Sequence, residues 1–236
     1  MGIINLSDNK TENVFVSCII AAAGSSLRMG VNKQFIELDG EKVLMRSVRV
    51  FEETPCIDEI IISARKEDAE LINRLVEECG FKKVRAVCEG GSTRQISVQN
   101  AVAFCKKQTG LIVIHDGARP LVTKETIEKT VASALENSAA ACAVRVKDTI
   151  KVADESAFIS STPDRSTLWA VQTPQVFDFE LYLKALESAS ADMTDDCRII
   201  EAAGGRVKLV EGEYTNIKIT TPEDIILAEA ILKARK

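Results

Sequence analysis

The stretch VFVSCIIAAAGSSLRMG at residues 14–30 decides the fold of this chain. Its apolar start, residues 14–20, is typical of a buried strand, and this strand runs into a loop of small residues. The loop holds one arginine, Arg28, and Lys33 follows within NKQF at residues 32–35. Small residues let a ligand approach the backbone, and amide N–H groups in such a turn can bind an anion. The pattern therefore predicts either an anion-binding loop or a simple connection from a strand to a helix.

The two cations near this loop favour a polyphosphate ligand. The loop has neither the GxxxxGK[ST] pattern of the P-loop nor the GxGxxG pattern of dinucleotide-binding proteins. Nucleotidyl transfer depends mainly on positioning and on neutralising charge in the transition state. Arginine offers a planar fork to phosphate oxygens, whereas lysine offers a mobile point charge. Arg28 and Lys33 are therefore candidate catalytic cations, although either residue alone is typical of a solvated surface.

The rest of the chain alternates between strand-like and helix-like patterns. Strand-like runs occur at residues 58–64, 82–89, 111–116, 140–146, 206–212 and 216–220. Helical patterns occur at residues 43–53, 67–80, 94–107, 124–138 and 222–236. This alternation predicts an α/β, Rossmann-like fold, in which helices cover both faces of a mostly parallel sheet. Ligands in such sheets bind at the carboxyl ends of strands, where both the opening loop and HDGARP at residues 115–120 are expected.

One segment, residues 147–169, breaks this alternation. It is polar, contains short β-prone pieces and has no helical pattern, which predicts a β-arm that projects from the sheet. A mobile surface loop is the alternative interpretation. We expect a single domain at residues 14–236 that carries this arm, preceded by a frayed or disordered extension at residues 1–13.

Composition limits the classes of protein that the chain can represent. Its 236 residues carry a net charge of −5. A general nucleic-acid binder usually has a basic surface, so we expect no nucleic-acid partner. The seven cysteines form no CxxC pair, and several lie in apolar runs, which favours a reducing, cytoplasmic location. The sequence has no pattern of a signal peptide and no apolar run of membrane-spanning length, so we expect no membrane partner.

Two neighbouring residues narrow the possible chemistry. His115 is the single histidine, so a histidine-rich metal site is excluded and an orienting hydrogen bond is expected in place of catalysis. Asp116 follows at the expected carboxyl end of the same strand, where an acid can contact a nucleotide ribose or a metal-bound water. Capping of the turn is the alternative role for Asp116.

Seven motifs occur along the chain in one order: AAAGSSLRMG with NKQF, EGGSTRQISVQNA, HDGARP, VKDTIK, DRSTLWAVQTPQVF, TDD and VEGEYTNIKITTPEDI. Together they resemble the 2-C-methyl-D-erythritol 4-phosphate cytidylyltransferases of the non-mevalonate isoprenoid pathway, from about Val14 to the C-terminus. The resemblance implies a nucleotidyltransferase that moves a cytidylyl group from CTP to methylerythritol phosphate. The products implied are 4-diphosphocytidyl-2-C-methyl-D-erythritol and pyrophosphate.

The resemblance also assigns roles to individual residues around CTP. Arg28 and Lys33 match the two cations that stabilise the pentacoordinate α-phosphate, and Mg²⁺ is implied on the triphosphate, with no protein metal ligands. The nucleotide-binding positions implied are Ala22, Ala23, Gly24, Gly90, Arg94, Ser97, Asp116 and Gly117. Among these, the segment from Gly90 to Ser97 matches the one that reads cytosine, and Asp116 and Gly117 match the ribose contacts.

A second set of residues is implied for methylerythritol phosphate. The matching positions are Arg165, Lys218, Thr149, Thr173 and Arg119. The substrate's phosphate is a dianion, which suits arginine and lysine. In the family the arm crosses to a second subunit, so the resemblance implies a homodimer in which Thr149 and Arg165 act in the partner's site.

Two other functions remain open at this point. TDDCR at residues 194–198 departs from the usual continuation of its motif, and ribitol 5-phosphate cytidylyltransferase resembles the chain through the same motifs. HDGARP and DRSTLWAVQTPQ favour the methylerythritol enzyme over it. The other alternative is a module that binds CTP without turning it over, against which the retained cations argue.

Overall fold

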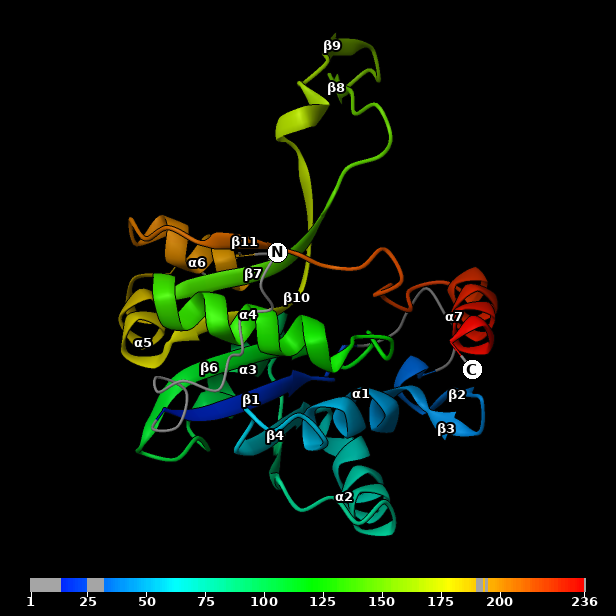
Figure 1. Ribbon diagram of the computed structural model, residues 1–236, viewed down its shortest axis with the longest axis vertical. Helices are drawn as coiled ribbons and strands as arrows, with labels where there is room; N and C mark the ends of the chain where they lie inside the picture. The colour runs from blue at the N-terminus through cyan, green and yellow to red at the C-terminus, as the bar shows by residue number, and fades with distance from the viewer. Residues whose placement is uncertain (1–13, 25–31, 190–192, 194, 236) are drawn as a thin grey trace, which may run out of the picture.

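A computed structural model describes residues 14–24, 32–189, 193 and 195–235 of the chain, and the expected extension at residues 1–13 lies outside this part (Figure 1). The described strands are β1 (Phe15–Ala21), β2 (Glu37–Leu38), β3 (Glu41–Lys42), β4 (Glu59–Ala64), β5 (Val84–Glu89), β6 (Thr109–Asp116), β7 (Ala139–Arg145), β8 (Val152–Ala153), β9 (Ile159–Ser161), β10 (Trp169–Asp178) and β11 (Lys208–Glu211). The described helices are α1 (Val43–Glu52), α2 (Ala69–Glu78), α3 (Arg94–Val102), α4 (Lys124–Asn137), α5 (Phe179–Ser188), α6 (Asp196–Ala202) and α7 (Pro222–Ala234). Short 3₁₀ turns lie at Lys33–Phe35, Lys66–Asp68 and Arg165–Thr167.

The central sheet has seven strands in the order β11-β7-β10-β6-β1-β4-β5. β6, β1, β4 and β5 run parallel to one another, and β7 and β11 also pair in parallel. β10 runs antiparallel to both β6 and β7, so the sheet is mixed but mostly parallel. The expected α/β fold is thereby confirmed.

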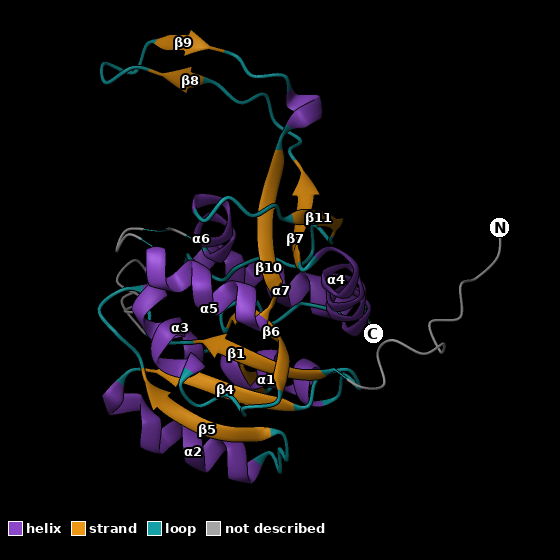
Figure 2. Cartoon of the chain, turned by 90° about the vertical axis from the view of Figure 1, so that its left-hand side faces the viewer, coloured by secondary structure: helices purple, strands orange, loops and turns teal. Residues whose placement is uncertain are grey.

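Helices cover both faces of this sheet, and each face has its own apolar core (Figure 2). Side chains of successive strand residues point to opposite faces, so Cys18 of β1 packs in one core and Ile19 in the other. Helices α1, α2 and α4 contribute apolar residues to the first core, and α3, α5 and α6 contribute to the second. Burial on both faces explains why the central strands are continuous apolar runs.

The parallel strands place their carboxyl ends at one edge of the sheet. In the pairing register, Ala21 at the end of β1 lies beside Ser63 of β4 and beside Asp116 of β6. The neighbouring pair places Ala64 beside Glu89 at the end of β5. The loops that follow these strands therefore meet at this edge.

The segment between β7 and β10 projects from the sheet as an arm (Figures 1 and 2). It carries a small antiparallel hairpin made by β8 and β9. Near its base, Nη1 of Arg165 donates a hydrogen bond to the carbonyl oxygen of Lys147 at 2.7 Å. Phe158 and Ile159 on the hairpin are 72% and 64% exposed. The arm thus presents apolar side chains to solvent.

Some predicted element boundaries are wrong. Residues 216–220 are not a strand, because they share a single backbone hydrogen bond with the loop after β6, from Ile219 N–H to the Ala118 carbonyl at 2.8 Å, in place of a ladder. The helix expected at residues 94–107 ends at Val102 and is followed by turns. Strand β10 and helices α5 and α6 were not assigned from the sequence pattern.

No helix within the described ranges is both long and apolar enough to cross a bilayer.

Candidate active site

A pocket of about 510 Å³ opens at the carboxyl ends of β1, β4, β5 and β6. Its described walls are formed by Ala21, Ala23, Gly24, Lys33, Gln34, Arg65, Gly91, Ser92, Thr93, Arg94, Ser97, Asp116, Ala118 and Lys218. Most of these residues follow directly after a strand, which is where ligands bind in open α/β sheets. The wall carries four cationic side chains and one carboxylate, although the chain has a net charge of −5. The pocket is therefore suited to an anionic ligand.

The opening loop is fixed by hydrogen bonds to the neighbouring strands. The N–H of Ala22 donates to the carbonyl oxygen of Ser63 on β4 at 2.7 Å, and the N–H of Gly117 donates to that of Ala21 at 2.9 Å. Ala22 is buried behind the pocket wall, while residues 23–24 line the pocket. The sheet thus fixes the backbone of this loop, which is the part of the loop that a ligand was expected to approach.

The second loop, which follows β5, packs tightly against the opening loop. A Cβ atom at Gly90 would lie 2.4 Å from Cβ of Ala23 and 2.9 Å from Oγ of Ser97, so only glycine fits there. Ser97 Oγ accepts the N–H of Gly91 at 3.0 Å and donates to the carbonyl oxygen of Thr93 at 2.8 Å. The hydroxyl of Ser97 therefore ties the loop to the start of α3, and Ser97 is also one of the residues that line the pocket.

Lys33 is held at the pocket by the residues around it. It begins a 3₁₀ turn that Asn32 caps, with Asn32 Oδ1 accepting the N–H of Gln34 at 3.2 Å. Asn32 Nδ2 donates to Asp68 Oδ2 at 2.9 Å, and the same oxygen accepts from Arg65 Nε at 2.7 Å. One buried carboxylate thus fixes both the turn of Lys33 and the side chain of Arg65, and both cations line the pocket.

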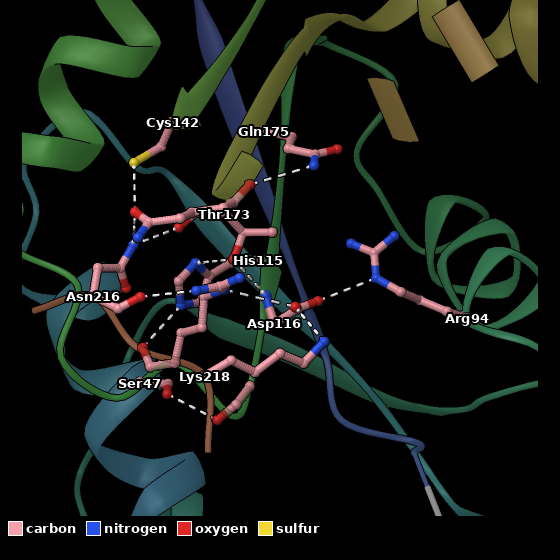
Figure 3. Close-up of polar contacts among 12 residues, drawn as sticks. Ser47, Arg94, His115, Asp116, Cys142, Thr173, Gln175, Asn216 and Lys218 are labelled. Carbon is pink, nitrogen blue, oxygen red and sulfur yellow. Dashed lines mark hydrogen bonds and ion pairs between the residues drawn. The ribbon is translucent and has the colours of Figure 1, made fainter. Parts of the chain in front are cut away.

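Asp116 is the shared partner of three cations (Figure 3). Its Oδ1 lies 3.1 Å from Nε of Arg94, and its Oδ2 lies 2.7 Å from Nζ of Lys218 and 3.8 Å from Nε of Arg119. Burial acts to raise the pKa of Asp116, but the three cations outweigh it and hold this pKa well below its usual range. Asp116 is therefore an anion at neutral pH and orients the cationic side chains around it.

His115 and Thr173 form a hydrogen-bonded relay behind Asp116 (Figure 3). His115 Nε2 lies 3.1 Å from the carbonyl oxygen of Arg119, which can only accept, so Nε2 carries the proton. The bare Nδ1 accepts the hydroxyl hydrogen of Thr173 at 3.0 Å, and Thr173 Oγ1 accepts the N–H of Asp116 at 3.1 Å. Burial lowers the pKa of His115 to about 3, so the ring is neutral at physiological pH. The orienting role expected for His115 agrees with this geometry.

The residues singled out from the sequence fall into four groups. Lining the pocket are Ala23, Gly24, Lys33, Arg94, Ser97, Asp116 and Lys218. Behind the wall lie Ala22, Gly90, Gly117, Arg119 and Thr173, within one or two contacts of it. Thr149 and Arg165 are exposed on the arm and do not line this pocket. Arg28 lies outside the described residues.

Several residues at the site were not found from the sequence. Arg65 lines the pocket, and its place directly after the strand at residues 59–64 is the signal that could have identified it. Gln34 lines the pocket beside Lys33 and is buried. Asp196 contacts Arg94 from α6, 102 positions along the chain, and no local pattern connects the two.

The described residues do not build a metal site of their own. Within residues 14–24, 32–189, 193 and 195–235, no group of three or more His, Cys, Asp or Glu side chains could hold a metal ion. The carboxylate in the pocket wall, Asp116, is already paired with cations.

Known proteins resemble the chain over nearly its whole length. The family model IspD, described as 2-C-methyl-D-erythritol 4-phosphate cytidylyltransferase, matches residues 16–234. Proteins with that name from Alkaliphilus oremlandii and Caldanaerobacter subterraneus are 45% and 47% identical to the chain, and the matches cover 95% and 92% of it and 98% and 99% of the relatives. A solved 4-diphosphocytidyl-2C-methyl-D-erythritol synthase from Anaerococcus prevotii is 37% identical, with a TM-score of 0.85, over 94% of this chain and 98% of that one.

Proposed function

The chain belongs to the 2-C-methyl-D-erythritol 4-phosphate cytidylyltransferase family, and we propose that its cationic pocket is where the cytidylyl group of CTP passes to methylerythritol phosphate. The products are 4-diphosphocytidyl-2-C-methyl-D-erythritol and pyrophosphate. The observation that carries the choice of pocket is the gathering of four cations around two tightly packed glycine loops at the carboxyl ends of the strands. CTP is a polyanion and the phosphate of methylerythritol phosphate is a dianion, so such a pocket suits both.

The proposed reaction is an in-line displacement at phosphorus. A phosphate oxygen of methylerythritol phosphate attacks the α-phosphorus of CTP, a new P–O bond forms, and the bond to the bridging oxygen of pyrophosphate breaks. The attacking oxygen is already an anion, so the step needs no general base. The neutral, buried His115 supports this, because burial lowers its pKa to about 3 and both ring nitrogens are hydrogen-bonded within the protein.

Neutralisation of charge at the α-phosphate is assigned to Lys33 and Arg28. Lys33 lines the pocket on a turn that Asn32 and Asp68 hold in place, which is the positioning that catalysis by charge requires. Arg28 belongs to the opening loop in the sequence and keeps its role as a proposal from the family pattern. Arg65, on the same side of the pocket, adds a cation for the phosphates of the nucleotide or of the leaving pyrophosphate.

Recognition of the nucleoside is assigned to the two glycine loops. The segment from Gly90 to Ser97 presents backbone groups and the Ser97 oxygen, which can pair with the donor and acceptor edge of cytosine. Asp116, in the pocket wall, is assigned to the ribose, since a carboxylate has enough lone pairs to accept a hydroxyl hydrogen while it pairs with cations. Gly117, directly behind the wall, keeps its assignment to the ribose as a proposal from the family pattern.

Methylerythritol phosphate is assigned to the side of the pocket around Lys218. Lys218 is partly exposed there, and its ammonium group lies on Asp116, so it can meet a phosphate dianion without leaving its partner. Arg119 is largely buried and donates to the carbonyl oxygen of Asn216 at 2.8 Å. Thr173 has its hydroxyl hydrogen committed to His115. We therefore assign Arg119 and Thr173 to shaping this part of the site.

Mg²⁺ fits this proposal as a companion of CTP. Asp116 is paired with cations, whereas triphosphate oxygens are the ligands that Mg²⁺ prefers when the protein offers few carboxylates. Bound in this way, Mg²⁺ would offset negative charge on the triphosphate and on the leaving pyrophosphate.

A cytoplasmic location is also part of the proposal, because seven cysteines without a CxxC pair suit a reducing compartment.

The proposed enzyme is a homodimer formed through the arm. Phe158 and Ile159 expose apolar surface on the hairpin, and Thr149 and Arg165 lie on the same arm without lining the pocket of their own chain. A partner's pocket is the place where these two residues can act. Mixing Lys33→Ala and Arg165→Ala chains tests this, because a mixed dimer then holds one intact site. Each variant alone should be nearly inactive, and the mixture should recover about a quarter of wild-type activity; no recovery from refolded mixtures contradicts the shared site.

Pyrophosphate release tests the function. Wild-type protein is given CTP and Mg²⁺ with methylerythritol phosphate, with ribitol 5-phosphate, or with no acceptor. We expect rapid release with methylerythritol phosphate and release at least about a hundredfold slower in the other two reactions, since the acceptor's hydroxyl pattern must match the site. Faster release with ribitol 5-phosphate would instead identify a ribitol 5-phosphate cytidylyltransferase. CTP binding without release in any reaction would identify a non-catalytic module.

A further inference from the structure

Asp196 is a fully buried carboxylate that lies outside the pocket wall and reaches it through Arg94. Its Oδ2 lies 2.5 Å from Nη1 of Arg94, and its Oδ1 accepts a hydrogen bond from the hydroxyl of Tyr182 at 2.6 Å. Both oxygens of a buried anion are therefore committed, and the partner on the pocket side is a residue assigned to the nucleotide. The proposed reaction gives no role to Asp196 or to Tyr182.

Arg94 is anchored between two carboxylates. Its Nε lies 3.1 Å from Asp116 Oδ1, and its Nη1 lies on Asp196, so two different nitrogens of one planar group have fixed partners. Burial acts to lower the pKa of Arg94, but Asp196 and Asp116 outweigh it and raise this pKa. Two anchors fix the plane of a guanidinium, whereas one anchor leaves it free to turn about that contact.

The support behind Asp196 is itself rigid. Gln175 Oε1 accepts the N–H groups of both Asp196 and Cys197 at 3.2 Å, which fixes the first turn of α6 to β10. Tyr182 stacks on Phe177 with ring centroids 5.3 Å apart. A charged group with such support meets the general requirement for positioning a functional side chain, because its own conformation is already locked.

The charges around Asp116 show what the second carboxylate achieves. Asp116 also serves Lys218 and Arg119, so without Asp196 three cations would share one anion. Arg94 would then compete with Lys218 for Asp116. With Asp196 present, Arg94 has a partner of its own and Lys218 stays directed into the pocket.

We propose that Asp196 is a positioning residue of the nucleotide site, which fixes the guanidinium plane of Arg94 without touching the substrate. The role rests on the proposed function for the identity of the nucleotide. The contacts of the carboxylate with Arg94 and Tyr182 carry the positioning itself.

Asp196→Asn tests the role, because it removes the charge and keeps the shape. Asp195→Asn is the matched control, since Asp195 caps α6 by accepting the N–H of Arg198 at 3.0 Å and asparagine caps equally well. The dissociation constant of CTP, measured by calorimetry, should rise about tenfold in Asp196→Asn and stay within about twofold in the control. KM for CTP should rise in step, while KM for methylerythritol phosphate stays within about twofold. A folded Asp196→Asn with wild-type CTP affinity overturns the proposal.

A double-variant cycle separates positioning from a structural role. In an Arg94→Ala background, Asp196→Asn should change CTP affinity by less than about twofold, because its effect passes through Arg94. Fully additive effects overturn the proposal. If Asp196→Asn does not fold, Tyr182→Phe removes one contact of Asp196 and keeps its charge. The dissociation constant of CTP should then rise about threefold, and this rise should vanish in the Arg94→Ala background. No rise in either background overturns the proposal.

One readout does not depend on turnover. The Nε–H resonance of Arg94 should be sharp and slowly exchanging in the wild type and broadened in Asp196→Asn, without any nucleotide. An unchanged resonance overturns the positioning role, whereas an altered resonance in a protein that shows no pyrophosphate release supports positioning and refutes the proposed function alone.

Discussion

His115 makes the stability of the fold depend on pH in a window that can be calculated. Burial lowers its pKa to about 3 in the folded chain, whereas an unfolded histidine titrates near pH 6.5. Between these values the unfolded chain binds a proton that the folded chain does not. The free energy of unfolding therefore falls as pH falls through this window, and the contribution of His115 is fully present only above about pH 6.5.

The size of the effect follows from the same two values. Each pH unit inside the window changes the free energy of unfolding by about 1.4 kcal/mol, so a change from pH 7.5 to pH 5 should remove about 2 kcal/mol. Asp116 adds a loss in the same direction only below about pH 4, because the cations around it lower its folded pKa and its unfolded pKa is ordinary. His115 is the only histidine in the chain, so no other imidazole contributes to this interval.

Urea unfolding at pH 7.5, 6 and 5 measures the prediction. The comparison is between the wild type and His115→Gln, whose amide can still donate toward the Arg119 carbonyl and accept from Thr173. The wild type should lose about 2 kcal/mol across the series and the variant less than half of that, whatever its stability at pH 7.5. Equal losses in the two proteins would refute the reasoning, and so would an NMR titration of the folded wild type that gives His115 an ordinary pKa.

Three substitutions probe the walls of the pocket. Asn32→Ala removes the cap of the Lys33 turn, and we expect the free energy of unfolding, measured with urea, to fall by about 1 kcal/mol and KM for CTP to rise. An unchanged KM for CTP would contradict the link between this turn and the pocket. Gly90→Ala places a Cβ atom 2.4 Å from that of Ala23, so calorimetry should show CTP affinity reduced at least about tenfold, and unchanged affinity would mean that the loops need no close contact. Thr173→Val breaks the relay behind the site and should destabilise the fold by about 1–3 kcal/mol in urea unfolding, while Thr173→Ser should be nearly neutral.

Local pattern was sufficient for six of the seven strands of the central sheet, whereas β10 was not assigned from it. The apolar runs that became β1, β4 and β6 are buried on both faces, and such continuous runs occur in parallel sheets. The same reasoning placed the opening loop and Asp116 at the carboxyl ends of strands, where the pocket lies. Residues 216–220 show its limit, because alternating apolar residues also occur in an extended segment that packs on a loop and pairs with no strand.

The electrostatics of the site could not be predicted from local pattern. Arg94 and Asp196 are 102 positions apart and meet only because α3 and α6 cover the same face of the sheet. The family resemblance implied a substrate contact for Thr173. Local pattern did not predict that its hydroxyl hydrogen points to His115, because this pairing depends on the antiparallel course of β10 beside β6. Such pairings depend on topology, and topology brings together residues that the sequence keeps far apart.

Lys33→Ala measures the central claim most directly. In a single-turnover reaction with CTP, Mg²⁺ and methylerythritol phosphate, the variant should release pyrophosphate about 10²–10³-fold more slowly than the wild type, because the cation proposed to act at the α-phosphate is lost. Lys184→Ala, an exposed lysine on α5 away from the pocket wall, is the matched control and should stay within about twofold. A folded Lys33→Ala protein that releases pyrophosphate at nearly the wild-type rate would contradict transfer in this pocket.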